Sequence, residues 1–198
     1  MIYVKKIPTK KEYGGCYQEL CHRAGVELLK YSFFKECGFS FCEEDILKEK
    51  HGKPYIENAP YSFNISHCDG LVVCALSKNR VGVDVEGIRR ILPRVMKRCY
   101  SDNEIAYVNS NGNKDMAFTR LWTLKESYVK YTGDGVSSNL KAVNFDLESE
   151  KAFADNVFFT QIELNEKYII SICKDEKSQN IRLDAINMEI QDVIELDI

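Results

Sequence analysis

The chain has 198 residues, of which 44% are hydrophobic and 29% are charged, and its formal net charge is -3. This length suits one large domain or two small ones, with enough apolar side chains for a core. The mildly acidic balance argues against a general nucleic-acid binder, which usually has a basic surface. No apolar run reaches the roughly 20 residues that a membrane-spanning helix needs.

The eight cysteines include no CxxC pair, so a zinc site is not expected. Most of them lie at apolar-patterned positions, as Cys74 does within residues 71–76. Residues 1–11 also lack the apolar segment of a secretory signal peptide. We therefore expect reduced, mostly buried thiols and a cytoplasmic protein.

The first part of the chain predicts one strand and two helices. Residues 1–7 have the pattern of a short strand. Apolar residues then recur at helical spacing from Tyr17 to Tyr31, and Gly38 is the expected stop of this helix. A second, short helix is expected over residues 43–50.

Three strands are expected next, after a loop at Gly52–Pro54. They cover residues 62–66, 71–77 and 81–86, and only three or four residues separate each from the next. Such short connections favour hairpins, so the three strands predict an antiparallel meander.

Helices follow the meander, and strands follow the helices. Pro93 suits the first turn of a helix that runs to Cys99, and Ser101 with Glu104 fits a capping box for a helix to about Val108. A long helix is expected over residues 118–131. The remaining apolar alternation predicts strands at 142–147, 157–163, 168–173 and 181–186.

The order of elements is a helix followed by strands, twice over. This order predicts an α+β fold with two pseudo-symmetric α/β halves, each a helix packed on a small, largely antiparallel sheet. We place the halves at residues 1–80 and 81–198.

An acidic strand is the first candidate site. Successive side chains of a strand alternate between its faces, so Asp84 and Glu86 lie on one face, about 7 Å apart, opposite the valines at 81, 83 and 85. Two carboxylates this close repel each other, and a divalent cation would relieve the repulsion. Gly82 is expected to leave space beside them. Oxygen-rich sites with few protein ligands suit Mg²⁺, which keeps waters and takes phosphate oxygens as further ligands.

The long helix at 118–131 is the second candidate. Lys125 falls inside its apolar arc, where a solvated lysine is not expected. Glu126 and Lys130 are neighbours at i and i+4. An ordinary amphipathic helix with a surface ion pair is the alternative. Together with the acidic strand, a third carboxylate and two lysines favour a metal–phosphate site.

Four motifs occur in a fixed order: GKP at 52–54, FNISH at 63–67, GVDVE at 82–86 and WTLKESYVK at 122–130. This set resembles the 4′-phosphopantetheinyl transferase superfamily, and more narrowly its surfactin-synthetase-activating type, a monomer with two pseudo-symmetric halves. The resemblance implies magnesium-dependent transfer of phosphopantetheine from coenzyme A to a serine of an acyl or peptidyl carrier protein. Adenosine 3′,5′-bisphosphate would be released.

The resemblance also implies residue roles. Asp84, Glu86 and Glu126 match the family's magnesium-binding carboxylates, and Lys130 and Lys125 match lysines that face the phosphates. Glu126, directly or through a metal-bound water, is the expected base, with Lys130 and Asp84 as the other catalytic residues.

The coenzyme A contacts that the resemblance implies lie mainly in the first half. Arg23 matches an arginine near the 3′-phosphate, and His67 matches a histidine at another phosphate. Ser66, directly before His67, is expected to contact coenzyme A as well. The segment lining the adenine is Gly52, Lys53, Pro54 and Tyr55. The alternatives are a solvated helix face for Arg23, a solvated loop for Lys53 and a structural role for His67. Only four lysines precede the first helix, at 5, 6, 10 and 11, where the family has a basic stretch that helps to hold the 3′-phosphate.

Other interpretations remain open. A metal-dependent phosphohydrolase could use the same carboxylates without a carrier protein, and a non-catalytic module could bind coenzyme A or a carrier. Glu104 matches a family glutamate but fits its capping box equally well. A basic cluster follows the acidic strand and is either a docking surface for the carrier or a solvated helix face. Its members are Arg89, Arg90, Arg94, Lys97 and Arg98.

Overall fold

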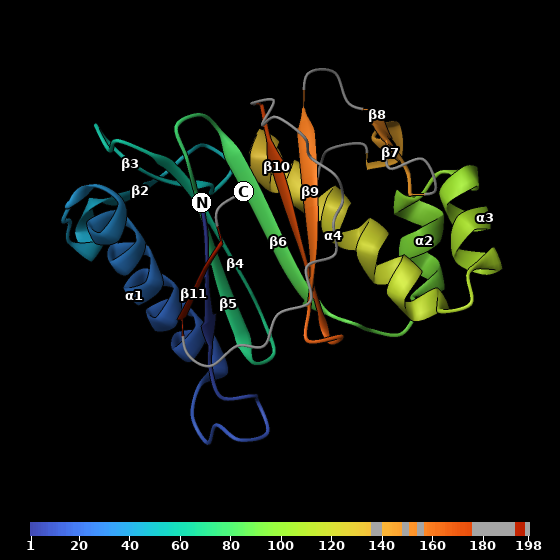
Figure 1. Cartoon of the computed structure of the whole chain (residues 1–198), viewed down its shortest axis with the longest axis horizontal. Coiled ribbons are helices and arrows are strands. Elements are labelled where there is room, and N and C mark those ends of the chain that lie inside the picture. Colours follow the sequence, from blue (N-terminus) through green and yellow to red (C-terminus); the bar gives the residue numbers. More distant parts are fainter. Residues whose placement is uncertain (136–139, 148–150, 154–156, 176–192, 197–198) are drawn as a thin grey trace.

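The computed structural model describes residues 1–135, 140–147, 151–153, 157–175 and 193–196. Helices form the two outer layers, and two antiparallel sheets lie between them (Figure 1). The predicted α+β class with two α/β halves is confirmed. The boundary that we place near residue 80 stays a prediction.

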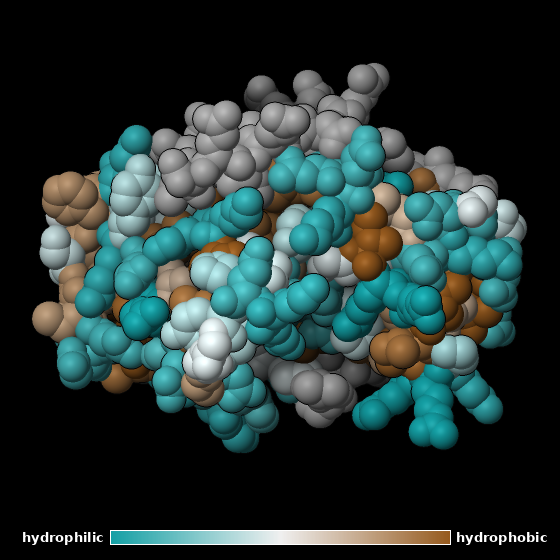
Figure 2. Space-filling model, turned by 90° about the horizontal axis from the view of Figure 1, so that it is seen from below, coloured by the Kyte–Doolittle hydropathy of each residue, from teal (hydrophilic) through white to brown (hydrophobic). Residues whose placement is uncertain are grey.

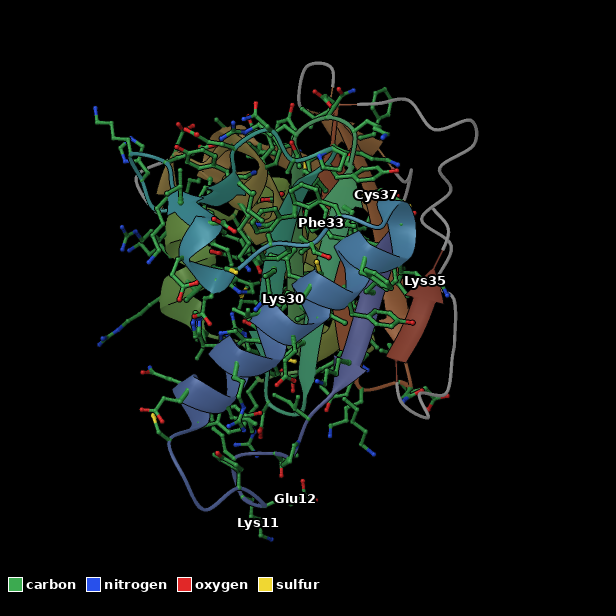
Figure 3. The ribbon with its side chains drawn as sticks, turned by 90° about the vertical axis from the view of Figure 1, so that its left-hand side faces the viewer. Lys11, Glu12, Lys30, Phe33, Lys35 and Cys37 are labelled. Carbon is green, nitrogen blue, oxygen red and sulfur yellow. The ribbon has the colours of Figure 1, made fainter. Side chains whose placement is uncertain are left out.

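The first sheet has four antiparallel strands in the order β11-β1-β5-β4. They are β11 (Val193–Leu196), β1 (Ile2–Lys6), β5 (Leu71–Ser77) and β4 (Ser62–Cys68). Helix α1 (Tyr17–Cys37) crosses the outer face of this sheet, where Phe33 is fully buried (Figure 3). The helix ends at Gly38, whose φ of 66° is left-handed, as the glycine predicted.

The helix predicted over 43–50 is wrong. Only Glu43–Asp45 forms a turn of 3-10 helix, and β2 (Ile46–Lys48) pairs with β3 (Pro54–Ile56) as a hairpin. Gly52 adopts a φ of 91° in the connection, a conformation that glycine adopts without steric strain. This turn, rather than helical periodicity, decides the local structure.

The predicted meander is wrong at its third strand. Strand β6 (Val81–Gly87) pairs with β10 (Tyr168–Lys174), which pairs with β9 (Phe158–Leu164), in a separate sheet. Strands β4 and β6 instead meet through side chains, since the Val83 amide donates to Asn64 Oδ1 at 2.8 Å. The backbone of β6 is thus paired along its whole length by β10, and not by a continued hairpin with β5.

Three helices cover the outer face of the second sheet or pack beside it: α2 (Pro93–Cys99), α3 (Asp102–Ser110) and α4 (Lys114–Thr132). The capping box of Ser101 and Glu104 is present. Helix α4 begins at Lys114, earlier than predicted, because the side chain of Asn113 caps its first turn.

The segment after α4 contains short elements. A 3-10 turn at Leu140–Ala142 precedes β7 (Asn144–Asp146), which pairs with β8 (Lys151–Phe153). The strand predicted from residue 142 therefore starts at Asn144. The strand predicted at 181–186 lies outside the described residues. None of the helices within the described ranges is both long and apolar enough to cross a membrane.

The packing of α4 on β6 positions the candidate site. Val81, Val83 and Val85 are buried between the two sheets, as the alternation predicted. Gly82 faces α4, and a Cβ built there would lie 2.1 Å from the Ser127 carbonyl oxygen. The expectation that Gly82 leaves space beside the carboxylates is therefore wrong, because the helix backbone occupies that space.

Candidate metal and phosphate site

Two elements that are distant in sequence bring the acidic residues together. Strand β6 carries Asp84 and Glu86, and α4 carries Glu126 and Lys130. The close approach at Gly82 lets the helix lie directly on the strand. The charges of these four side chains act on one another: those of Asp84, Lys130 and Glu86 all shift the pKa of Glu126.

Asp84 is the most constrained member of the cluster. It is only 5% exposed, and its Oδ1 accepts from Lys130 Nζ at 2.6 Å and from Ser66 Oγ at 3.0 Å. The Lys130 ammonium also donates to Ser66 Oγ at 2.8 Å. The second carboxylate oxygen, Oδ2, is buried and has no hydrogen-bond partner in the described residues. A buried acceptor without a donor calls for a partner from outside the chain, such as a water or an ion.

The two glutamates are held in a less polar environment than free carboxylates. Burial raises the pKa of Glu126, the charge of Asp84 raises it further, and Lys130 opposes both. Burial also raises the pKa of Glu86, against the opposing effect of Arg89, whose guanidinium lies 3.1 Å from Glu86 Oε1. A bound cation would stabilise the ionised forms of both glutamates and so lower their pKa.

The chemistry of the donors fits magnesium in part. Among the residues that the structure describes, no group of three acidic, histidine or cysteine side chains is close enough to hold a metal ion by itself. Magnesium needs no such cage, because it is often bound by one or two carboxylates plus waters and substrate phosphates. The free Oδ2 of Asp84, with Glu86 and Glu126 nearby, suits that kind of site.

Ser66 and His67 bring β4 to the same region. Ser66 is buried and bonded to both Asp84 and Lys130. The His67 side chain is exposed, but partial desolvation of its ring and the charge of Lys130 lower its pKa. An anion beside His67 would reverse this shift, so its position remains compatible with a phosphate contact.

Lys125 does not reach this cluster. Its side chain is 0% exposed, and its ammonium donates to the carbonyls of Leu140 at 2.9 Å and Val143 at 2.7 Å. It also pairs with Glu104 Oε1 at 3.0 Å. All three donors are used, so a phosphate contact by Lys125 finds no support in this geometry.

Glu104 completes the same buried structure. It is 1% exposed and accepts from the Ser101 amide at 2.7 Å and the Phe145 amide at 3.0 Å. The pair of Glu104 and Lys125 thus links α3, α4 and the segment that follows α4. Of the two alternatives for Glu104, the geometry favours the structural one.

The GKP segment lines a cavity of about 250 Å³. Lys53, Pro54 and Tyr55 form part of its wall, whereas Gly52 is the hairpin turn. The Lys53 ammonium is neither solvated nor turned to an open site, since it donates to three backbone carbonyls. Arg23 lies exposed on α1, which agrees with the alternative that it belongs to a solvated helix face.

Two residues of this region were not foreseen. Arg80 and Glu49 line the same cavity and join each other at 2.8 Å, and Arg80 also binds the end of α4. The only sequence signal was a single arginine directly before the acidic strand. No residue near Arg80 in the sequence indicates that it contacts the end of α4, which is 51 to 52 residues later.

Comparison with known proteins shows what the chain is similar to. Residues 80–173 match the model of the 4′-phosphopantetheinyl transferase superfamily. The 4′-phosphopantetheinyl transferase gsp of Aneurinibacillus migulanus is 39% identical over 97 residues, which are 47% of this chain and 40% of that protein. A 4′-phosphopantetheinyl transferase of Bacillus subtilis is 26% identical over 169 residues, 79% of this chain and 75% of that protein.

A third relative, 4′-phosphopantetheinyl transferase Sfp of Bacillus subtilis (strain 168), is 31% identical over 105 residues. The match covers 52% of this chain and 47% of Sfp, so the aligned region spans about half the length of Sfp and somewhat less of gsp. The resemblance to the superfamily and to its surfactin-synthetase-activating type is confirmed. The matched region contains β6 and α4, and therefore all three carboxylates and Lys130.

Proposed function

We propose that this chain transfers 4′-phosphopantetheine from coenzyme A to a serine of an apo-carrier protein, depends on magnesium, and releases adenosine 3′,5′-bisphosphate. One observation carries the proposal. Asp84 is a buried carboxylate with one oxygen bound by Lys130 and Ser66 and the other left without a donor, inside the region that matches the family.

The metal would be held by Asp84, Glu86 and Glu126. When bound, magnesium supplies positive charge that offsets the charge on the pyrophosphate oxygens. Lys130 would turn its ammonium from Asp84 toward a phosphate oxygen, and His67 would contact a further phosphate. Phosphoryl transfer depends chiefly on such positioning and charge stabilisation.

Glu126 is the proposed base. A base works best when its pKa lies near the working pH, and burial and the charge of Asp84 raise the pKa of Glu126. It would accept the proton of the carrier serine, directly or through a water, as the serine oxygen bonds to the β-phosphorus. The bond to the leaving phosphate breaks in the same displacement.

The nucleotide end of coenzyme A would lie in the first half, at residues 1–80, and the metal site in the second, at 81–198. We place the adenine at the cavity wall formed by Pro54 and Tyr55, beside the Gly52 turn. Lys53 is left out of the coenzyme A contacts, because its ammonium is bound to three backbone carbonyls. Arg23 stays a proposal for the 3′-phosphate that no contact supports, and Lys125 is left out of the phosphate set. We expect a cytoplasmic monomer.

The test is incubation of the chain with coenzyme A, Mg²⁺ and several apo-carrier proteins, followed by mass spectrometry of the carriers. A gain of one phosphopantetheine supports the transferase. Free phosphate without carrier modification supports a phosphohydrolase, and neither product supports a binding module. Asp84→Asn is the matched control, since it keeps the shape of the side chain and removes its charge.

A further inference from the structure

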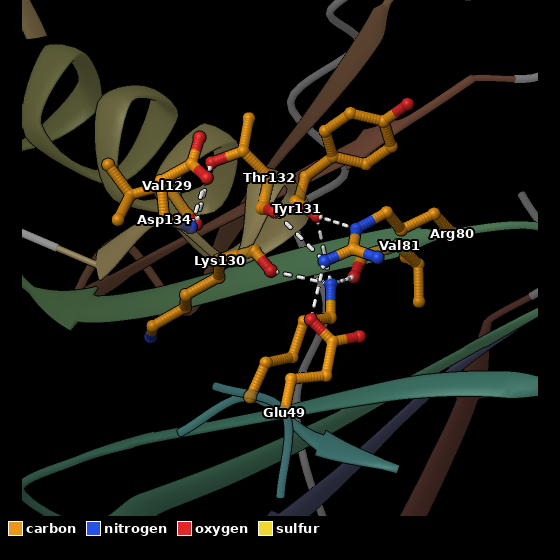
Figure 4. A network of polar contacts seen from close by, with 9 residues as sticks. Glu49, Arg80, Val81, Val129, Lys130, Tyr131, Thr132 and Asp134 are labelled. Atoms are coloured by element: carbon orange, nitrogen blue, oxygen red, sulfur yellow. Dashed lines mark hydrogen bonds and ion pairs between the residues drawn. The ribbon is translucent and has the colours of Figure 1, made fainter. Parts of the chain in front are cut away.

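The last turn of α4 is held by two cations from other elements. The final carbonyls of a helix have no partner within the helix. Here the carbonyls of Lys130, Tyr131 and Thr132 are bound by Lys53 and Arg80. Figure 4 shows the guanidinium of Arg80 at the carbonyls of Tyr131 and Thr132. We call Glu49, Lys53 and Arg80 the α4 clamp.

Lys53 joins α4 to β6. Its ammonium donates to the Lys130 carbonyl at 2.6 Å, the Tyr131 carbonyl at 3.0 Å and the Val81 carbonyl at 2.7 Å. All three donors are thus spent on the two elements that carry the acidic cluster. Burial, and then the charge of Arg80, lower the pKa of Lys53 to about 8. The three carbonyl acceptors offset the loss of water around the charge.

Arg80 joins α4 to the β2–β3 hairpin. Its guanidinium donates to the carbonyls of Tyr131 and Thr132, the latter at 2.9 Å, and pairs with Glu49 Oε2 at 2.8 Å. Gly133, which ends α4 with a φ of 74°, makes room for this arrangement. A Cβ at Gly133 would lie 2.6 Å from Arg80 and 3.0 Å from Glu49.

Lys130 connects the clamp to the candidate site. Its carbonyl is bound by Lys53, while its side chain runs the other way (Figure 4) and its ammonium binds Asp84 at 2.6 Å. We propose that Lys53 and Arg80 are positioning residues, which hold the end of α4 so that Lys130 stays aligned with Asp84. The proposal rests on the proposed function for its catalytic readout.

The clamp also lines the cavity at the GKP segment. Glu49, Lys53 and Arg80 all contribute to its wall. The Lys53 ammonium nevertheless has all three donors on backbone carbonyls, so Lys53 acts on the reaction through α4 and not as a hydrogen-bond donor to coenzyme A. This assignment differs from the adenine-lining role that the family resemblance implies for Lys53, and kinetics separate the two.

The experiment compares the full-length variants Lys53→Met and Arg80→Met with wild type. We expect kcat with coenzyme A, Mg²⁺ and an apo-carrier to fall about 10- to 100-fold, the range for misplaced reacting groups. The Michaelis constant for coenzyme A should change less than about threefold, since no ligand contact is removed. Hydrogen exchange at residues 130–132 should speed up about fivefold or more as the helix end is released.

Lys53→Arg and Arg80→Lys keep a cation and should recover part of kcat and of the exchange protection. Lys48→Met, an exposed lysine of the same hairpin, is the control and should match wild type in both readouts. If Arg80→Met does not fold, Glu49→Gln removes its anchor alone and should shift exchange in the same direction by a smaller factor.

A raised Michaelis constant for coenzyme A with unchanged kcat and unchanged exchange would overturn the proposal and make Lys53 a ligand contact. Wild-type values in both methionine variants would overturn it as well. If the wild-type chain transfers nothing, the proposed function fails, whereas exchange at the end of α4 still decides whether the clamp holds it.

Discussion

Gly82→Ala, which adds one methyl group to β6, should strongly destabilise the packing of α4 on this strand. The added Cβ would lie 2.1 Å from the Ser127 carbonyl oxygen and 2.3 Å from the Tyr131 amide nitrogen, where ordinary contact begins at 3.4 Å. Both atoms belong to the backbone of α4, so no side chain can turn away. The helix must move off the strand by more than about 1 Å.

The magnitude follows from packing. Added methyl groups in a packed interior cost about 1–3 kcal/mol, and a clash with backbone belongs at the upper end. For 198 residues, an unfolding free energy lower by about 3 kcal/mol corresponds to a melting temperature lower by about 7 °C. The same shift carries Glu126 and Lys130 away from Asp84, and a displacement of about 1 Å can lower turnover roughly 100-fold.

Thermal unfolding and phosphopantetheine transfer, measured on one preparation, check this prediction. Gly87→Ala on the same strand is the matched control, because its Cβ would meet nothing nearer than 3.9 Å. That variant should stay within about 1 kcal/mol of wild type. A Gly82→Ala protein with wild-type melting temperature and activity would refute the assigned packing of α4 on β6.

Three further predictions concern charge. Asp84→Asn should lower turnover by orders of magnitude with the fold intact. With coenzyme A present, Mg²⁺ at about ten times its Kd should raise the unfolding free energy of wild type by about 1.4 kcal/mol and should leave that of the variant unchanged. Equal stabilisation of both proteins would place the metal elsewhere. Since the folded pKa of Glu126 is raised, its ionisation destabilises the fold as pH rises above the ordinary 4.5. Glu126→Gln should therefore be more stable than wild type at pH 7, with the gain vanishing near pH 4 in denaturant titrations; a gain that persists at pH 4 contradicts the charge argument. Arg94 and Lys97 lie exposed close in sequence to Leu92, which is 45% exposed. Reversing the charges of these two residues should raise the Michaelis constant for the carrier and not that for coenzyme A. Raising salt from about 50 to 500 mM should likewise weaken carrier association, and equal effects on both substrates would exclude this docking surface.

Local sequence determined the elements whose causes lie within a few residues. Gly38 ends α1 because a left-handed residue is needed there, and Ser101 with Glu104 caps α3 through bonds between near neighbours. Alternation along β6 placed its valines on the buried face and Asp84 on the other. The four spaced motifs likewise predicted the family, since they require only residue identity and order.

Tertiary structure decided what each face meets. The partner of β6 is β10, more than 80 residues later, although β5 lies one short turn away. Two lysines of one helix also received opposite roles: Lys125 is buried against Glu104, and Lys130 binds Asp84. Helical periodicity gives the angle between such residues, but not the identity of the neighbour on either side.

The α4 clamp shows the same limit most clearly. Lys53 lies 77 residues before Lys130, and Arg80 lies 52 residues before Thr132, whose carbonyls they bind. These separations are about the length of a small domain. The acceptors are backbone oxygens, which every residue has, so no residue type in the sequence marks them. Only the folding of the β2–β3 hairpin and of the segment before β6 against the end of α4 brings these charges to that helix terminus. Side-chain reach is short, and chain distance does not determine spatial distance.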